Sequence, residues 1–102
     1  MTSSGNTEVI RSFKDARAQA IFEGRSPGKR FPADIIRAAR RKLIMIAEAR
    51  AIEDLRVPPA NRLEALRGDR AGQYSIRIND QWRICFVWTQ DGVTDVEMVD
   101  YH

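Results

Sequence analysis

The sequence contains only one cysteine and one histidine in 102 residues, and this scarcity excludes several kinds of site. With Cys85 alone, no internal disulfide can form, which is typical of proteins from a reducing compartment. Zinc centres need several cysteine or histidine ligands, so a metal site of that kind is effectively excluded. Glycine-rich phosphate loops and the GxSxG nucleophile motif are also absent from the sequence. The chain therefore lacks the familiar signatures of nucleotide-binding proteins, zinc enzymes and serine hydrolases.

Long apolar runs are missing too, because charged residues interrupt each apolar stretch within a few positions. No segment is therefore expected to span a bilayer. Residues 1–7 are polar and lack the apolar region of a secretory signal, which predicts a disordered leader. Residues 8–102 have the length of one domain. We expect a single cytoplasmic domain with no membrane partner and no cofactor.

Lysine is scarce as well: only Lys14, Lys29 and Lys42 contribute to the 17 basic residues, so arginine carries most of the positive charge. Guanidinium groups bind phosphate in a bidentate manner and stack on bases. With a net charge of +3, this bias favours a polyanionic partner. A GC-rich coding sequence would produce the same bias, and composition leaves both explanations open.

The first half of the chain is predicted to be mainly helical. A short run at residues 8–13 predicts a first strand, and residues 14–23 have the spacing of a helix. A longer helix is expected over residues 32–50. Its apolar stripe, expected to pack in the core, consists of Ile35, Ile36, Ala39, Leu43, Ile46 and Ala47. The opposite, basic face is either solvated or a contact for RNA or a partner, and it carries Arg37, Arg40 and Arg41.

Alternation with a period of two predicts strands in the second half, at residues 62–66, 74–78, 82–88 and from 96 to the C-terminus. The prolines at positions 58 and 59 predict an extended crossing between the two halves. Turns are expected at residues 68–72, 79–81 and 91–92. Strands joined by short turns are antiparallel, so the predicted class is α+β, with helices packed on a meander.

The only histidine, His102, follows Asp100 and Tyr101 directly after the last predicted strand. An imidazole titrates near neutrality and can give or take a proton. A terminal histidine is commonly an uninformative tail residue, but a preceding strand would hold these three residues at the edge of a site. Cys85 lies mid-strand among apolar neighbours and is expected to be a buried hydrophobic residue, not a nucleophile.

Arginines are expected to gather on one face of the same sheet. Arg77 and Arg83 alternate with apolar residues on adjacent strands, so both should face away from the principal core. Arg62, Arg67 and Arg70 flank the preceding strand and loop. Such guanidinium groups could hold a phosphate and stabilise charge that develops at phosphorus. Each pair taken alone is more commonly a solvated surface.

Three segments together resemble a known family. They are RLEALRGDRAGQYSIRINDQWRICFVW at 62–88, VEMVDYH at 96–102 and VIRSFKD at 9–15. They resemble the HigB-type toxins of the RelE superfamily, and within that group the GraT-like members. The resemblance covers nearly the whole chain after the first eight residues. It implies a RelE-like, microbial-RNase-type fold in which two N-terminal helices pack on a curved antiparallel sheet, in the order β-α-α-β-β-β-β.

The resemblance also implies an activity and partners. The chain would be the toxin of a type II toxin–antitoxin system that cuts mRNA in a ribosome-dependent manner and so inhibits translation and growth. A HigA-type antitoxin with a helix-turn-helix domain would neutralise it, and operator DNA would be reached only through that antitoxin. The apolar strip of Ile10, Ile21 and Phe22 is expected in the core, with an antitoxin surface as the alternative.

Carried over position by position, the resemblance implies a set of catalytic residues, namely Glu64, Arg67, Arg83, Asp100, Tyr101 and His102. The remaining arginines of the face would bind RNA, namely Arg62, Arg70 and Arg77. Some HigB toxins have a histidine where this chain has Glu64. Neighbouring arginines favour the charged carboxylate, which suits a base better than an acid. This departure predicts a slow or differently organised enzyme.

The expected reaction is a metal-free transesterification by the ribose 2′-hydroxyl. His102 would be the leading acid or base and Asp100 would orient it, while Glu64 is the second candidate base. Tyr101 would stack on a base or donate a proton, and Arg83 with Arg67 would stabilise the transition state. The alternative is a non-catalytic module that binds nucleic acid or a partner, for example a co-repressor that acts only with its antitoxin.

Overall fold

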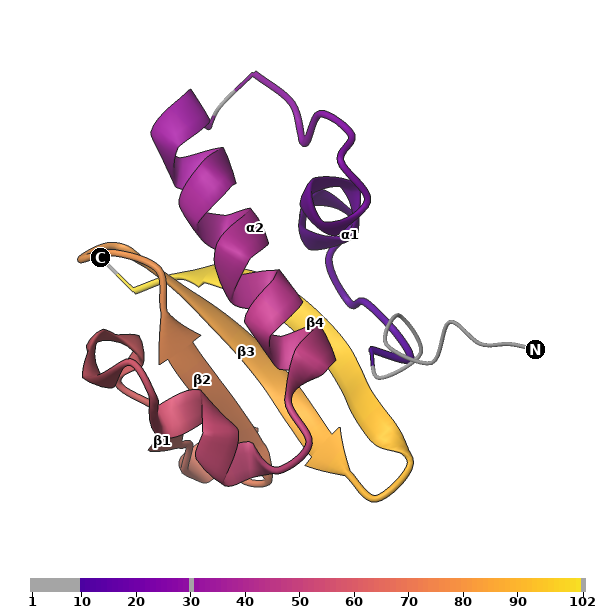
Figure 1. Ribbon diagram of the computed structural model, residues 1–102, viewed down its shortest axis with the longest axis vertical. Helices are drawn as coiled ribbons and strands as arrows, with labels where there is room; N and C mark the ends of the chain where they lie inside the picture. Colours follow the sequence, from indigo (N-terminus) through magenta and orange to yellow (C-terminus); the bar gives the residue numbers. More distant parts are fainter. Residues whose placement is uncertain (1–9, 30, 102) are drawn as a thin grey trace.

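Within residues 10–29 and 31–101, which the structure describes, two α-helices cover one face of a four-stranded antiparallel sheet (Figure 1). The structure is a computed structural model. Its helices are α1 (Ala16–Phe22) and α2 (Ala33–Glu48). Its strands follow the order of the chain across the sheet: β1 (Glu64–Ala65), β2 (Gln73–Arg77), β3 (Trp82–Thr89) and β4 (Gly92–Asp100). The predicted α+β class and the antiparallel meander are confirmed.

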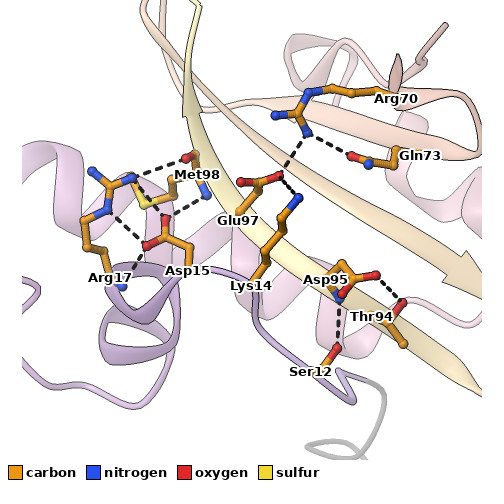
Figure 2. Close-up of polar contacts among 10 residues, drawn as sticks. All are labelled: Ser12, Lys14, Asp15, Arg17, Arg70, Gln73, Thr94, Asp95, Glu97 and Met98. Carbon is orange, nitrogen blue, oxygen red and sulfur yellow. Dashed lines mark hydrogen bonds and ion pairs between the residues drawn. The ribbon is translucent and has the colours of Figure 1, made fainter. Parts of the chain in front are cut away.

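Helix α1 begins two residues later than predicted because Asp15 caps it. Asp15 has an extended backbone, and its carboxylate accepts the N–H of Arg17 at 2.9 Å. The same carboxylate accepts the N–H of Met98 in β4 at 3.1 Å, so one side chain both starts the helix and attaches it to the sheet (Figure 2). Burial of this carboxyl opposes its ionisation, but the hydrogen bonds from Arg17 and Met98 outweigh burial and lower the pKa of Asp15.

Helix α2 confirms the predicted long helix and its stripe. Ala39, Leu43, Ile46 and Ala47 are buried, and the arginines of the opposite face are exposed. Together with Ile10 and Ile21, the stripe packs on the apolar side of strands β2 to β4, which consists of Ile76, Ile84, Phe86, Val96 and Met98. Ile10 and Ile21 are therefore core residues, as expected, and Phe22 is half-buried beside them.

The first predicted strand, at residues 8–13, is wrong in its described part. Ile10 and Phe13 form only isolated parallel bridges to Val93 and Val96 of β4. Between these bridges Asp95 adopts a left-handed conformation, with φ of 56°, and its N–H binds the Ser12 hydroxyl instead of continuing a ladder. Residues 1–9, and with them the predicted leader, lie outside the described residues.

The link between the helices and the sheet also differs from the prediction. Pro58 is extended, but Pro59 begins a short 3₁₀ helix, η3 (Pro59–Asn61), since proline suits a first helical position. A second 3₁₀ helix, η2 (Ile52–Arg56), was not predicted. Arg62 ends η3 in a left-handed conformation with φ of 47°, and this shortens the predicted strand at 62–66 to the two residues of β1.

The last hairpin is confirmed but begins earlier than predicted. Thr89 pairs with Gly92, so Gln90 and Asp91 form the turn and β4 starts four residues before position 96. The turn at 68–72 contains another short 3₁₀ helix, η4 (Gly68–Arg70). In the part of the chain that the structure describes, no helix has the length and apolar character needed to cross a membrane.

Candidate active site

The sheet face that points away from the helices, termed the outer face, carries a polar row across all four strands. Every second residue of the central strands belongs to the core, so the residues between them point outward. The register pairs Glu64 with Ser75, Ser75 with Cys85 and Cys85 with Glu97. Three polar side chains and the Cys85 thiol, one from each strand, therefore lie side by side in the middle of this face.

Arg83 lies on the outer face, and several contacts fix its guanidinium. Its Nε donates to Ser75 Oγ at 2.8 Å, and its Nη2 donates to the carbonyl oxygen of Arg62 at 2.7 Å. The Tyr101 ring covers it, with 5.6 Å from the guanidinium carbon to the ring centroid, and Glu64 Oε1 is 3.6 Å from Nη2. Only 11% of the Arg83 side chain is exposed. A restrained, largely desolvated cation of this kind is preorganised to stabilise negative charge.

Tyr101 and Cys85 form the neutral part of the site. Burial raises the pKa of the Tyr101 hydroxyl, and the Cys85 thiol raises it further, so the phenol stays protonated near neutral pH. Burial likewise raises the pKa of the Cys85 thiol, whose residue is 0% exposed. The predicted burial of Cys85 is confirmed. Its side chain, however, lies on the outer face beneath Tyr101 and not among the core residues that contact the helices.

A charged cluster adjoins this pair on β4 (Figure 2). Arg70 Nη1 donates to Glu97 Oε2 at 2.9 Å and to Gln73 Oε1 at 3.0 Å. Lys14 Nζ lies 3.8 Å from the same Glu97 oxygen. The hydrogen bond that Arg70 donates to Glu97 raises the pKa of the Arg70 guanidinium, which remains charged. The cluster therefore brings two cations to one carboxylate at the side of the site opposite β1.

The remaining predicted arginines lie around this centre. Arg77 pairs with Arg83 across β2 and β3, so both face away from the core as predicted, and Arg77 forms an ion pair with Asp80. Arg62 and Arg67 are exposed. Within the described residues, neither of these two side chains takes part in an ion pair or a side-chain hydrogen bond. They are available to a ligand that approaches the outer face from β1.

The C-terminal residues are not all on one face. Asp100 pairs with Trp82, whose ring packs against Phe31 at 5.2 Å, so alternation assigns Asp100 to the opposite face from Arg83. Gln81 Nε2 donates to Asp100 Oδ2 at 3.1 Å. His102 lies outside the described residues. Of the predicted catalytic residues, the structure brings Arg83, Tyr101 and Glu64 together and places Asp100 beside Gln81.

Sequence reasoning missed Ser75 and Glu97. Both lie in the period-two alternation that placed Arg77 and Arg83 on the outer face, so the same pattern extended in each direction would have included them. Within the described residues, no group of three or more cysteine, histidine, aspartate or glutamate side chains is placed to hold a metal ion. The site consists of arginines, a tyrosine and carboxylates, a combination that suits phosphate binding and proton transfer.

Comparison with known proteins places this site in context. The family model described as RelE-like toxin of type II toxin–antitoxin system HigB matches residues 11–102. Toxin HigB-1 of Vibrio cholerae serotype O1 is 40% identical over 90 residues, which cover 88% of this chain and 94% of that protein. Endoribonuclease HigB of Proteus vulgaris is 32% identical over 95 residues, which cover 92% of this chain and 100% of that protein.

Proposed function

The chain belongs to the family of RelE-like HigB toxins of type II toxin–antitoxin systems, and we propose that it is an endoribonuclease that cuts mRNA on the ribosome. Family membership and the name of the Proteus relative support the endoribonuclease activity. Membership also implies an antitoxin partner. The chemistry that best fits the outer face is a metal-free transesterification, which yields a 2′,3′-cyclic phosphate and a 5′-hydroxyl.

The observation that carries this proposal is the fixed guanidinium of Arg83. When the 2′-hydroxyl attacks phosphorus, negative charge grows on the non-bridging phosphate oxygens. Arg83 uses Nε and Nη2 for protein contacts. Among the described residues its Nη1 has no hydrogen-bond partner, so this nitrogen can donate to a phosphate oxygen. Exposed Arg67 would add a second cation from the β1 side.

Proton transfer needs a base for the 2′-hydroxyl and an acid for the leaving 5′-oxygen. Glu64, whose side chain is 61% exposed beside Arg83, is a candidate base. Tyr101 remains protonated and can donate to the leaving oxygen. His102 is the other acid–base candidate, and Asp100 would orient it. Each positioned proton-transfer group typically contributes roughly 10²–10⁴-fold.

Such a sparse set of groups favours a reaction that depends on the ribosome. Proximity and orientation can remove about 7–11 kcal/mol from a barrier, and the ribosome would supply them by placing the message. We further propose that the antitoxin is of the helix-turn-helix HigA type and that the toxin reaches operator DNA only through it. The protein would act in the cytoplasm, where its substrate is translated.

Mapping of transcript ends tests this function against the non-catalytic alternative. New 5′ ends should appear within translated regions of mRNA in cells that express the chain, as detected by primer extension. Arg83→Ala should abolish these ends while circular dichroism shows a folded protein. Purified protein should cut translated mRNA much faster than the same RNA without ribosomes. Unchanged transcripts in cells that express the intact chain would refute the nuclease assignment.

A further inference from the structure

Two cations on the outer face have no part in the mechanism above, although they reach the site from distant parts of the chain. Lys14 precedes α1, and Arg70 ends η4. Both converge on Glu97, in the middle of β4 (Figure 2). The Glu97 side chain is only 16% exposed, so its position is fixed by the sheet. One carboxylate shared by two cations leaves a net positive charge at this point.

The contacts with Glu97 leave most of the hydrogen-bond donors of these cations unused. Arg70 makes both of its side-chain bonds through Nη1, and within the described residues its Nε and Nη2 have no partner. Lys14 is 3.8 Å from Glu97, beyond the length of a hydrogen bond, and its side chain is 58% exposed. A ligand with several acceptor oxygens could therefore bind both cations without displacing Glu97.

The cluster lies close to the scissile position. Arg83 pairs with Val99, so Glu97 is its diagonal neighbour on the adjacent strand, about 7–8 Å away. The Tyr101 ring covers Arg83 at 5.6 Å on the same face, so the cluster lies on the face that carries the proposed catalytic groups. The two cations held at Glu97 therefore lie on the strand next to Arg83, beside the proposed scissile position.

We propose that Lys14 and Arg70, held by Glu97, form a second phosphate-binding subsite that takes the RNA phosphate adjacent to the one that is cut. This assignment rests on the proposed function. The subsite would fix the direction in which the RNA strand crosses the outer face, from Arg83 on β3 to Glu97 on β4. It would also explain why the segment before α1 carries a lysine to the face opposite the helices.

Binding of an uncleavable RNA tests the subsite. A 2′-O-methyl hexanucleotide lacks the attacking hydroxyl, and its affinity can be measured by fluorescence anisotropy at several salt concentrations. Lys14→Ala should weaken binding roughly threefold to tenfold, as expected for one exposed charge-assisted contact. The slope of log affinity against log salt should fall by about 0.7, the value for one phosphate on a single strand. Lys14→Arg should retain the wild-type affinity.

The matched control is Lys29→Ala, which removes an exposed lysine from the loop between α1 and α2. Thermal unfolding checks that both variants are folded. If they are, equal affinities and salt slopes for Lys14→Ala and Lys29→Ala would refute the proposed subsite. A second measurement uses hexanucleotides in which one linkage at a time is a neutral methylphosphonate. At one position the neutral linkage should weaken binding to the wild type markedly and binding to Lys14→Ala much less, because only Arg70 then remains to contact that phosphate.

The two proposals fail in different ways. If the wild type cuts mRNA but every neutral linkage weakens wild type and Lys14→Ala equally, the subsite is wrong and the nuclease function stands. If the hexanucleotide results are as expected but no transcript is cut, the nuclease function is wrong and the subsite remains an RNA-binding site.

Discussion

Replacing Arg83 with lysine separates the charge of this residue from its geometry. Lysine keeps the positive charge but carries a single nitrogen. Its three N–H donors share that nitrogen, so they cannot reproduce the rigid geometry in which Nε binds Ser75 Oγ, Nη2 binds the Arg62 carbonyl oxygen and Nη1 faces the phosphate. If catalysis depends on the fixed guanidinium geometry, the cleavage rate of Arg83→Lys should be closer to that of Arg83→Ala than to that of the wild type.

The expected magnitude follows from the role of the group. Loss of one preorganised donor to a developing oxyanion costs roughly 10²–10³-fold in rate, which corresponds to about 2.7–4 kcal/mol. The lysine can retain one of the two hydrogen bonds to Ser75 and Arg62, and loss of the other, which a charged group donates, should lower the free energy of unfolding by about 1.5–3 kcal/mol. A domain of this kind has about 5–15 kcal/mol in total, so the variant should remain folded.

The assay is cleavage of a defined mRNA in a reconstituted translation system, with the toxin in excess over ribosomes and primer extension as the readout. Thermal unfolding by circular dichroism reports the fold. Arg56→Lys is the matched control, because Arg56 is exposed in η2 and its ion-pair partner among the described residues is nearby Glu53. Cleavage by Arg83→Lys within about threefold of the wild type would refute the argument, since charge alone would then suffice.

Three further predictions follow from neighbouring groups. Tyr101→Phe keeps the ring over Arg83 but removes the phenolic proton, so single-turnover cleavage should fall by about 10²-fold; an unchanged rate would exclude Tyr101 as the acid. Asp15→Ala should lower the free energy of unfolding in urea by about 1–2 kcal/mol at pH 7. Folding lowers the pKa of Asp15, so this stabilisation is present above the unfolded-state pKa of 3.8 and is lost as the pH falls through the folded-state pKa. The difference in the free energy of unfolding between wild type and Asp15→Ala should therefore shrink in that acidic range. Cys85 is buried and its thiol pKa is raised, so iodoacetamide should alkylate the native protein at pH 8 far more slowly than the urea-unfolded protein, as followed by mass spectrometry; equal rates would contradict its burial.

The elements predicted best are those whose sequence pattern reflects burial on one side. The stripe of α2 and the alternation of β2 and β3 both record which residues face the core, and their boundaries lie within a few residues of the prediction. The predicted boundaries are wrong where the backbone conformation depends on a contact with a residue far away in the sequence. Asp15 could be read as an ordinary first-turn residue, but its bond to Met98 requires β4 to be already in place.

The same limit applies to the site, and the two cross-strand arginines show why. Arg77 and Arg83 occupy equivalent positions in the alternation, and the register makes them direct partners. The ion-pair partner of Arg77 is Asp80, three residues away in its own turn, whereas Arg83 Nη2 binds the carbonyl oxygen of Arg62, 21 residues away. That carbonyl belongs to a residue whose left-handed backbone, with φ of 47°, ends η3. Periodicity therefore places both arginines on the outer face, but only the tertiary structure shows that the Arg83 guanidinium is fixed by contacts from distant parts of the chain, which is the basis of its proposed role.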